Sequence, residues 1–184
     1  QLIIGGLFFL CIWLNIDQVF SLLPDTFIQG KWVVFYIALA QLFNMATGVN
    51  GAIILNSRYY RYDLYTNIIL VFVTIASNYL LIPLYGIDGA AMATAISVLL
   101  FNFIRLIIIK VKMNMHPFSL QTIKTILLLF IMFFILDFLP DTSYAFVDIV
   151  WKSIVVIILF IPSVIYFNLS KDITAIVKQL KNKL

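Results

Sequence analysis

Long apolar runs separated by short polar connectors dominate the pattern along the chain. A transmembrane helix needs about 20 apolar residues, and six runs reach or approach this length. The runs are continuous and lack the alternation of membrane strands. The pattern therefore predicts an all-α, polytopic bundle of about six transmembrane helices, at residues 2–14, 32–55, 65–84, 89–109, 120–138 and 145–167.

The stretch "NYLLIPLYGIDGAAMATAIS" (residues 78–97) joins the third and fourth runs and concentrates bend-forming and small residues. We expect Pro83 and Gly86 to end one helix and Gly89 to open the next, as an antiparallel hairpin. Small residues recur at every fourth position in two rows, and such rows let helix backbones approach closely in lipid. The rows are Gly86, Ala90 and Thr94, and Gly89, Ala93 and Ser97. Asp88 is interpreted as a solvated turn residue or a helix N-cap rather than as an ion ligand.

The distribution of charged residues predicts which ends of the runs face the cytoplasm. Hydrophobic residues make up 64% of the 184 and charged ones 11%, which favours a bilayer over water as the surrounding medium. Ten of the 12 Lys and Arg residues fall in alternate connectors, the exceptions being Lys31 and Lys152. By the positive-inside rule the C-terminus is cytoplasmic. Basic residues form no patch typical of nucleic-acid binding, so no nucleic-acid partner is expected.

The two ends of the chain carry separate expectations. The chain begins at Gln1 inside an apolar run, and we interpret it as the C-terminal part of a longer protein. The basic tail, residues 169–184, places Ile173, Ile176, Val177 and Leu180 on one stripe. Either a short helix lying on the inner leaflet or a solvated tail fits this pattern equally well.

Polar residues inside the runs are candidate ligands. Gln41, Asn44, Gly48 and Gly51 share one face if residues 32–55 form a continuous helix. Asn67 and Asn78 share a rough face of the third run. Each set is interpreted either as a cavity lining or as interhelical hydrogen bonding. Arg105, near the inner end of the fourth run, is expected to reach out to the headgroups.

Residue types that catalysis needs are sparse in this chain. The sequence contains no Glu, one His and one Cys, and it shows no metal-ligand spacing and no Gly-rich phosphate loop. Cys11 is interpreted as a small hydrophobic residue. We therefore expect no cofactor, no metal site and no enzymatic activity.

Residues 78–97 resemble the hairpin motif of the polysaccharide-export flippases, which belong to the superfamily of multidrug, oligosaccharidyl-lipid and polysaccharide exporters. "GVNGAIILNSRYYRYDLYTN" (residues 48–67) and "HPFS" (residues 116–119) are similar to lipopolysaccharide biosynthesis members from Bacteroidetes-type bacteria. The resemblance implies a MATE-like fold. Residues 1–110 would form four spans of its C-terminal lobe, residues 111–168 two additional helices, and residues 169–184 the cytoplasmic tail.

The resemblance implies transport of a polyprenyl-diphosphate-linked oligosaccharide across the bacterial inner membrane by alternating access, together with an N-terminal lobe of the same protein. Arg58 and Arg61 are candidates to meet the diphosphate at the cytoplasmic entrance, or else set the topology as interfacial charges. Positions that match the motif are expected to form the hairpin and its packing face: Pro83, Gly86, Gly89, Ala90, Ala91, Ala93 and Thr94.

Other functions stay open at this point. A multidrug or cation antiporter of the same superfamily needs a carboxylate within the membrane. An envelope glycan polymerase or acyltransferase subunit needs Arg or His near the outer surface, where the connectors are acidic. A purely structural membrane subunit is the fourth alternative.

Overall fold

The computed structural model describes residues 1–115, 118–142 and 144–170, and the tail positions named above lie outside these ranges. Within the described residues all regular elements are helical. They are α1 (Leu2–Leu14), α2 (Ile16–Ser21), the 3-10 helix η1 (Asp25–Gly30), α3 (Lys31–Thr47), α4 (Asn50–Leu55), α5 (Arg61–Met113), α6 (Leu120–Asp137) and α7 (Ala145–Tyr166). The all-helical prediction is confirmed.

Two helix ends coincide with local sequence features. α6 begins at a capping box, in which the Ser119 side chain accepts from the Thr122 amide and the Thr122 hydroxyl accepts from the Ser119 amide. α5 ends before Asn114, whose backbone is left-handed (φ 52°). Helices α1, α6 and α7 match the predicted runs to within a residue or two.

The second predicted run is wrong as a continuous helix. α3 ends at Thr47, and Gly48 takes a positive φ of 71° with ψ −143°, which breaks the helical path before α4 begins at Asn50. Gly51 therefore does not continue the face of Gln41 and Asn44. A glycine tolerates this conformation because it carries no Cβ, and an apolar pattern does not register such a break.

The chain forms two compact units. Of the described residues, the first comprises 1–5 and 23–115 and contains α3, α4 and α5; the second comprises 6–22, 118–142 and 144–170. Contacts thus group most of α1, and all of α2, with α6 and α7. In the second unit Gly6 of α1 lies so close to Leu129 of α6 that a Cβ there would overlap its side chain.

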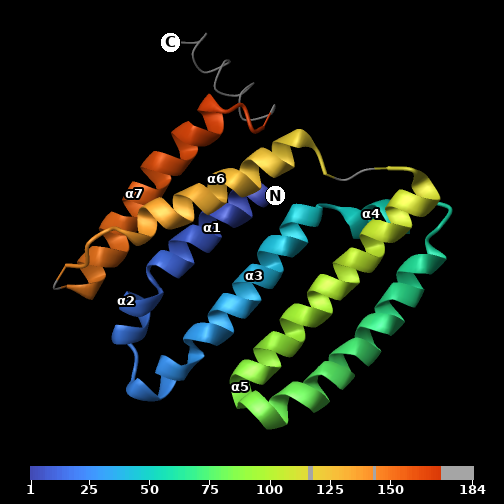
Figure 1. Cartoon of the computed structure of the whole chain (residues 1–184), viewed down its shortest axis with the longest axis horizontal. Coiled ribbons are helices and arrows are strands. Elements are labelled where there is room, and N and C mark those ends of the chain that lie inside the picture. Colours follow the sequence, from blue (N-terminus) through green and yellow to red (C-terminus); the bar gives the residue numbers. More distant parts are fainter. Residues whose placement is uncertain (116–117, 143, 171–184) are drawn as a thin grey trace. The chain divides into compact units, whose positions relative to one another are not determined.

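Helix α5 is a hairpin of two helical legs. Gly86 interrupts it with φ 57° and ψ −128°, a conformation available to glycine, and Pro83 precedes the break. The legs before and after Gly86 run side by side in opposite directions (Figure 1). A Cβ on Gly89 would overlap the Leu81 carbonyl, so the turn depends on the missing side chain. The predicted bend is present.

The second leg of α5 buries two opposite faces. Gly89, Ala93 and Ser97 are buried on the face that meets the first leg at Leu81. Ala91 and Asn102 are buried on the other side, where α3 packs. Small side chains on both faces let this leg lie between two neighbours.

The other predicted row of small residues does not pack within this unit. Gly86 and Thr94 are exposed and Ala90 is half-buried. The Thr94 hydroxyl donates to the Ala90 carbonyl of its own helix. The buried row is that of Gly89, Ala93 and Ser97, and Gly89 provides its close approach to the first leg at Leu81.

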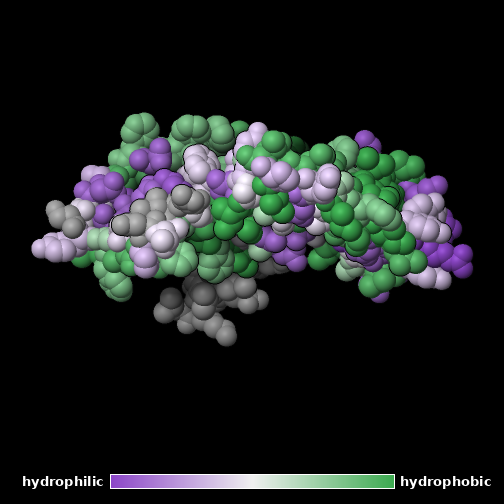
Figure 2. Space-filling model, turned by 90° about the horizontal axis from the view of Figure 1, so that it is seen from below, coloured by the Kyte–Doolittle hydropathy of each residue, from purple (hydrophilic) through white to green (hydrophobic). Residues whose placement is uncertain are grey.

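Three of the described helices, α5, α6 and α7, are long and apolar enough to cross a membrane, and α1 is apolar but shorter. Large hydrophobic side chains are exposed on these helices, including Phe72, Tyr79 and Leu84 on the first leg of α5. Hydrophobic residues cover much of the face seen in Figure 2. A surface of this kind indicates a membrane-associated protein.

Candidate functional site

An ion pair joins the two legs of the α5 hairpin at the end opposite the Gly86 turn. We call this end, where the first leg begins and the second leg ends, the open end. Arg105 Nη2 donates to Asp63 Oδ1, although the two residues are 42 positions apart in the chain. Asp63 lies in the first turn of α5 and Arg105 lies about two turns before the end. The antiparallel legs bring them together.

The Arg105 guanidinium lies inside the first unit. The side chains of Arg105 and Asp63 are only 15% and 18% exposed. The guanidinium carbon lies 3.9 Å from the centroid of the Phe101 ring, and Nη1 would lie 2.8 Å from a Cβ on Gly51. Gly51 thus leaves room for the guanidinium beside α4. The expectation that Arg105 reaches out to the headgroups is wrong, because this space and the Asp63 carboxylate hold it inward.

Asn67 holds the other side of the Asp63 carboxylate. Its Nδ2 donates to Asp63 Oδ2 at 3.0 Å and to the Asp63 carbonyl at 2.8 Å. Both carboxylate oxygens therefore have partners within α5. Asn67, one of the predicted ligands, supports the ion pair.

Buried polar side chains continue from the ion pair toward α3. Thr47 Oγ1 lies 3.1 Å from Asn102 Oδ1 and donates toward it, and Asn102 Nδ2 donates to the Val98 carbonyl. Thr47 and Asn102 are 2% exposed, and Asn50, the first residue of α4, is 1% exposed. The Thr47–Asn102 bond ties the end of α3 to the second leg of α5. Neither Nδ2 nor Oδ1 of Asn50 has a hydrogen-bond partner among the described residues.

The remaining predicted ligands are not gathered around this ion pair. Gln41 and Asn44 are exposed on α3, and Asn78 donates to Thr74 of its own helix. Arg58 and Arg61 are exposed before and at the start of α5. Their guanidinium groups lie over the rings of the adjacent tyrosines, at 4.9 Å from Tyr59 and 6.0 Å from Tyr60 respectively.

The second unit holds its own polar cluster at the α6–α7 connector. Lys152 of α7 and Gln18 of α2 both donate to Asp141 Oδ1. The buried Asp148 carboxylate accepts from the Thr142 amide at 2.9 and 3.0 Å and from Trp151 Nε1 at 2.9 Å. These bonds hold the connector against α2 and the first turns of α7, which is a structural role.

Sequence reasoning missed Asp63, Asn50 and Thr47. In the sequence Asp63 is surrounded by arginines and tyrosines, so it has the appearance of an ordinary charged residue at the membrane interface. A stronger sign was the i, i+3 spacing of Asn102 and Arg105, which places two polar groups on one face of an otherwise apolar helix.

The described residues offer charge and hydrogen-bond donors rather than reactive groups. Among them, no cluster of three or more His, Cys, Asp or Glu side chains could hold a metal ion. Arg105 is paired with Asp63, whereas Arg58 and Arg61 present exposed guanidinium groups. Comparison with protein-family models, curated proteins and solved structures finds no match to this chain.

Proposed function

We propose that this chain is the C-terminal part of a transporter that flips a polyprenyl-diphosphate-linked oligosaccharide across the bacterial inner membrane by alternating access. The α5 hairpin carries the proposal. Its motif, residues 78–97, coincides with the Gly86 turn and with the buried row that begins at Gly89. The residues that resemble the flippase motif thus form the turn of the hairpin and a buried face of its second leg.

Six crossings are part of the proposal. Each leg of α5, residues 61–85 and 87–113, exceeds the about 20 residues that a span needs. α6 and α7 add two more crossings. α1 followed by α2, and α3 followed by α4, supply the other two as interrupted helices, which in transporters border binding sites.

The charged residues of the first unit support one orientation. Arg58, Arg61 and Arg105 lie at the open end of the hairpin, and Asp88 lies at its turn. We assign the open end to the cytoplasm, because Lys and Arg favour cytoplasmic connectors. The C-terminus is then cytoplasmic as well.

In this scheme the exposed Arg58 and Arg61 first meet the diphosphate, because guanidinium groups match phosphate oxygens. Gln41 and Asn44, exposed on α3, offer hydrogen bonds to the sugars. Arg105 is occupied by Asp63 and acts on substrate only when the two legs separate at the open end.

Single introduced thiols test the orientation. In a Cys11→Ala background, Arg58→Cys and Asp88→Cys are expected to react with a membrane-impermeant maleimide from opposite faces of oriented vesicles. The two positions lie at opposite ends of the first leg and its turn. Labelling of both from one face contradicts the crossing scheme.

Deletion of the gene that encodes this chain tests the function. Lipid-linked repeat units are expected to accumulate on the cytoplasmic leaflet, and surface polysaccharide is expected to fall. Complementation with the Thr94→Ala form is expected to restore the polysaccharide, because Thr94 is exposed and outside the packed row. Normal surface polysaccharide in the deletion strain contradicts the proposal.

A cation or multidrug antiporter of the same superfamily is the second candidate, and Asp63 favours it. Its carboxylate is largely buried at the start of the first leg, where a bound cation would take the place of Arg105. The same deletion strain separates the two functions, because an antiporter predicts drug or cation sensitivity with unchanged surface polysaccharide.

A further inference from the structure

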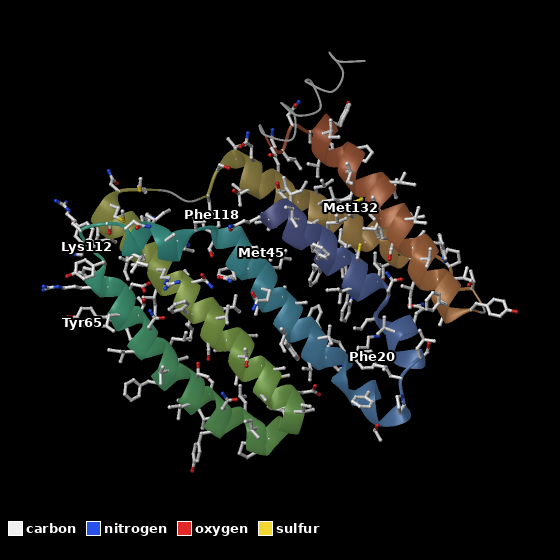
Figure 3. The ribbon with its side chains drawn as sticks, turned by 180° about the vertical axis from the view of Figure 1, so that it is seen from behind. Phe20, Met45, Tyr65, Lys112, Phe118 and Met132 are labelled. Atoms are coloured by element: carbon white, nitrogen blue, oxygen red, sulfur yellow. The ribbon has the colours of Figure 1, made fainter. Side chains whose placement is uncertain are left out.

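We propose that the open end of the α5 hairpin carries a binding site for the headgroup of an anionic phospholipid, formed by Arg58 and Lys112 on the rings of Tyr59 and Tyr62. Arg58 precedes the first leg and Lys112 ends the second. Only the hairpin brings them to the same end, where Figure 3 labels Tyr65 and Lys112. This inference does not depend on the proposed transport.

The four side chains form a continuous row. The Arg58 guanidinium carbon lies 4.9 Å from the centroid of the Tyr59 ring, and Lys112 Nζ lies 5.8 Å from that of Tyr62. The two rings are 6.1 Å apart, in edge-to-face contact. A cation over a tyrosine face is attracted by the ring, so both charges are held in place before a ligand arrives.

The positive charge of this row is not neutralised by the nearby carboxylate. Asp63 is the acidic residue closest to it in sequence, but its two oxygens accept from Arg105 and Asn67. Arg58, Arg61 and Lys112 form no ion pair with any residue that the structure describes. Because Asp63 is paired with the inward-facing Arg105, the exposed Arg58, Arg61 and Lys112 give this end of the hairpin a net positive surface.

Exposed apolar side chains in the same helical turns as the row point to a lipid as the occupant. Leu64 is 62% exposed and Val111 is 68% exposed, each within one turn of a tyrosine or lysine of the row. Tyrosines favour the headgroup depth of a bilayer, and nearby cations attract anionic lipids. A free phosphate would contact only the two cations. A phospholipid would also place its acyl chains against Leu64 and Val111.

Lipid titration of the purified chain in an uncharged detergent tests the site. Native mass spectrometry would count bound short-chain phosphatidylglycerol, phosphatidylcholine of equal chain length, and inorganic phosphate. We expect retention of phosphatidylglycerol and neither of the others. Lys112→Gln and Arg58→Gln are each expected to weaken it about fivefold, the effect of about 1 kcal/mol per surface cation.

Lys110→Gln is the matched control, because Lys110 is exposed on the same helix but lies over no tyrosine among the described contacts. It is expected to leave binding unchanged, and Tyr62→Leu is expected to match Lys112→Gln. An equal loss in Lys110→Gln, equal retention of phosphatidylcholine, or retention of a polyprenyl diphosphate without phosphatidylglycerol overturns the proposal. The lipid-binding results do not depend on the gene-deletion test of transport, so either proposal can fail without the other.

Discussion

Replacement of Gly89 by alanine is expected to destabilise the first unit by about 2 kcal/mol. Alanine improves helix propensity over glycine by about 1 kcal/mol. The added Cβ, however, would overlap the backbone carbonyl of Leu81, and overpacking of this kind costs about 3 kcal/mol. The clash outweighs the propensity. Unfolding in mixed micelles with increasing dodecyl sulfate, followed by circular dichroism, measures the free energy of unfolding.

Two controls identify the cause. Thr94→Ala, on the exposed side of the same leg, is expected to change the free energy of unfolding by less than about 0.5 kcal/mol. Leu81→Ala is not expected to rescue Gly89→Ala, because the overlapping atoms belong to the Leu81 backbone. A Gly89→Ala protein as stable as the wild type contradicts the close approach of the legs.

Replacement of Asp63 by alanine is expected to cost about 3 kcal/mol, because it leaves the Arg105 charge largely buried without a counter-charge. The Asn67 amide also loses an acceptor. The same dodecyl sulfate titration measures the loss. We expect the first unit to loosen at its open end, so amide exchange there should rise while that of α6 and α7 stays constant.

The double variant Asp63→Ala with Arg105→Met separates pairing from general disruption. It is expected to recover most of the lost stability, since methionine fills the space beside Phe101 without a charge. Arg61→Gln, an exposed cation of the same segment, is expected to have little effect. Equal losses in the single and double variants contradict an energetic ion pair.

Local sequence features predicted the helices and the bend but not the polar contacts. α6 and α7 follow from continuous apolar runs, and the turn follows from Pro83, Gly86 and Gly89. The break at Gly48 was missed because a single positive φ leaves the apolar pattern unchanged on either side.

The candidate site was predicted only in part. Arg58, Arg61 and Asn67 were chosen by residue type, and Asn67 turned out to hold Asp63. Gln41 and Asn44 share a face of α3, as one helix period requires, but remain exposed. Asp63 was overlooked because its partner is 42 residues away, beyond any window in which helical spacing is informative.

The sequence by itself determined α1, α6, α7 and the place where the α5 hairpin turns, but not the break at Gly48, because hydropathy, proline and glycine act through local conformation and solvation. Only the tertiary structure decided which charges meet. The register of the two legs places Arg105 against Asp63, and this pairing leaves Arg58 and Lys112 on the surface without a carboxylate. These contacts depend on that register, and Gly89 allows the legs to approach closely at Leu81.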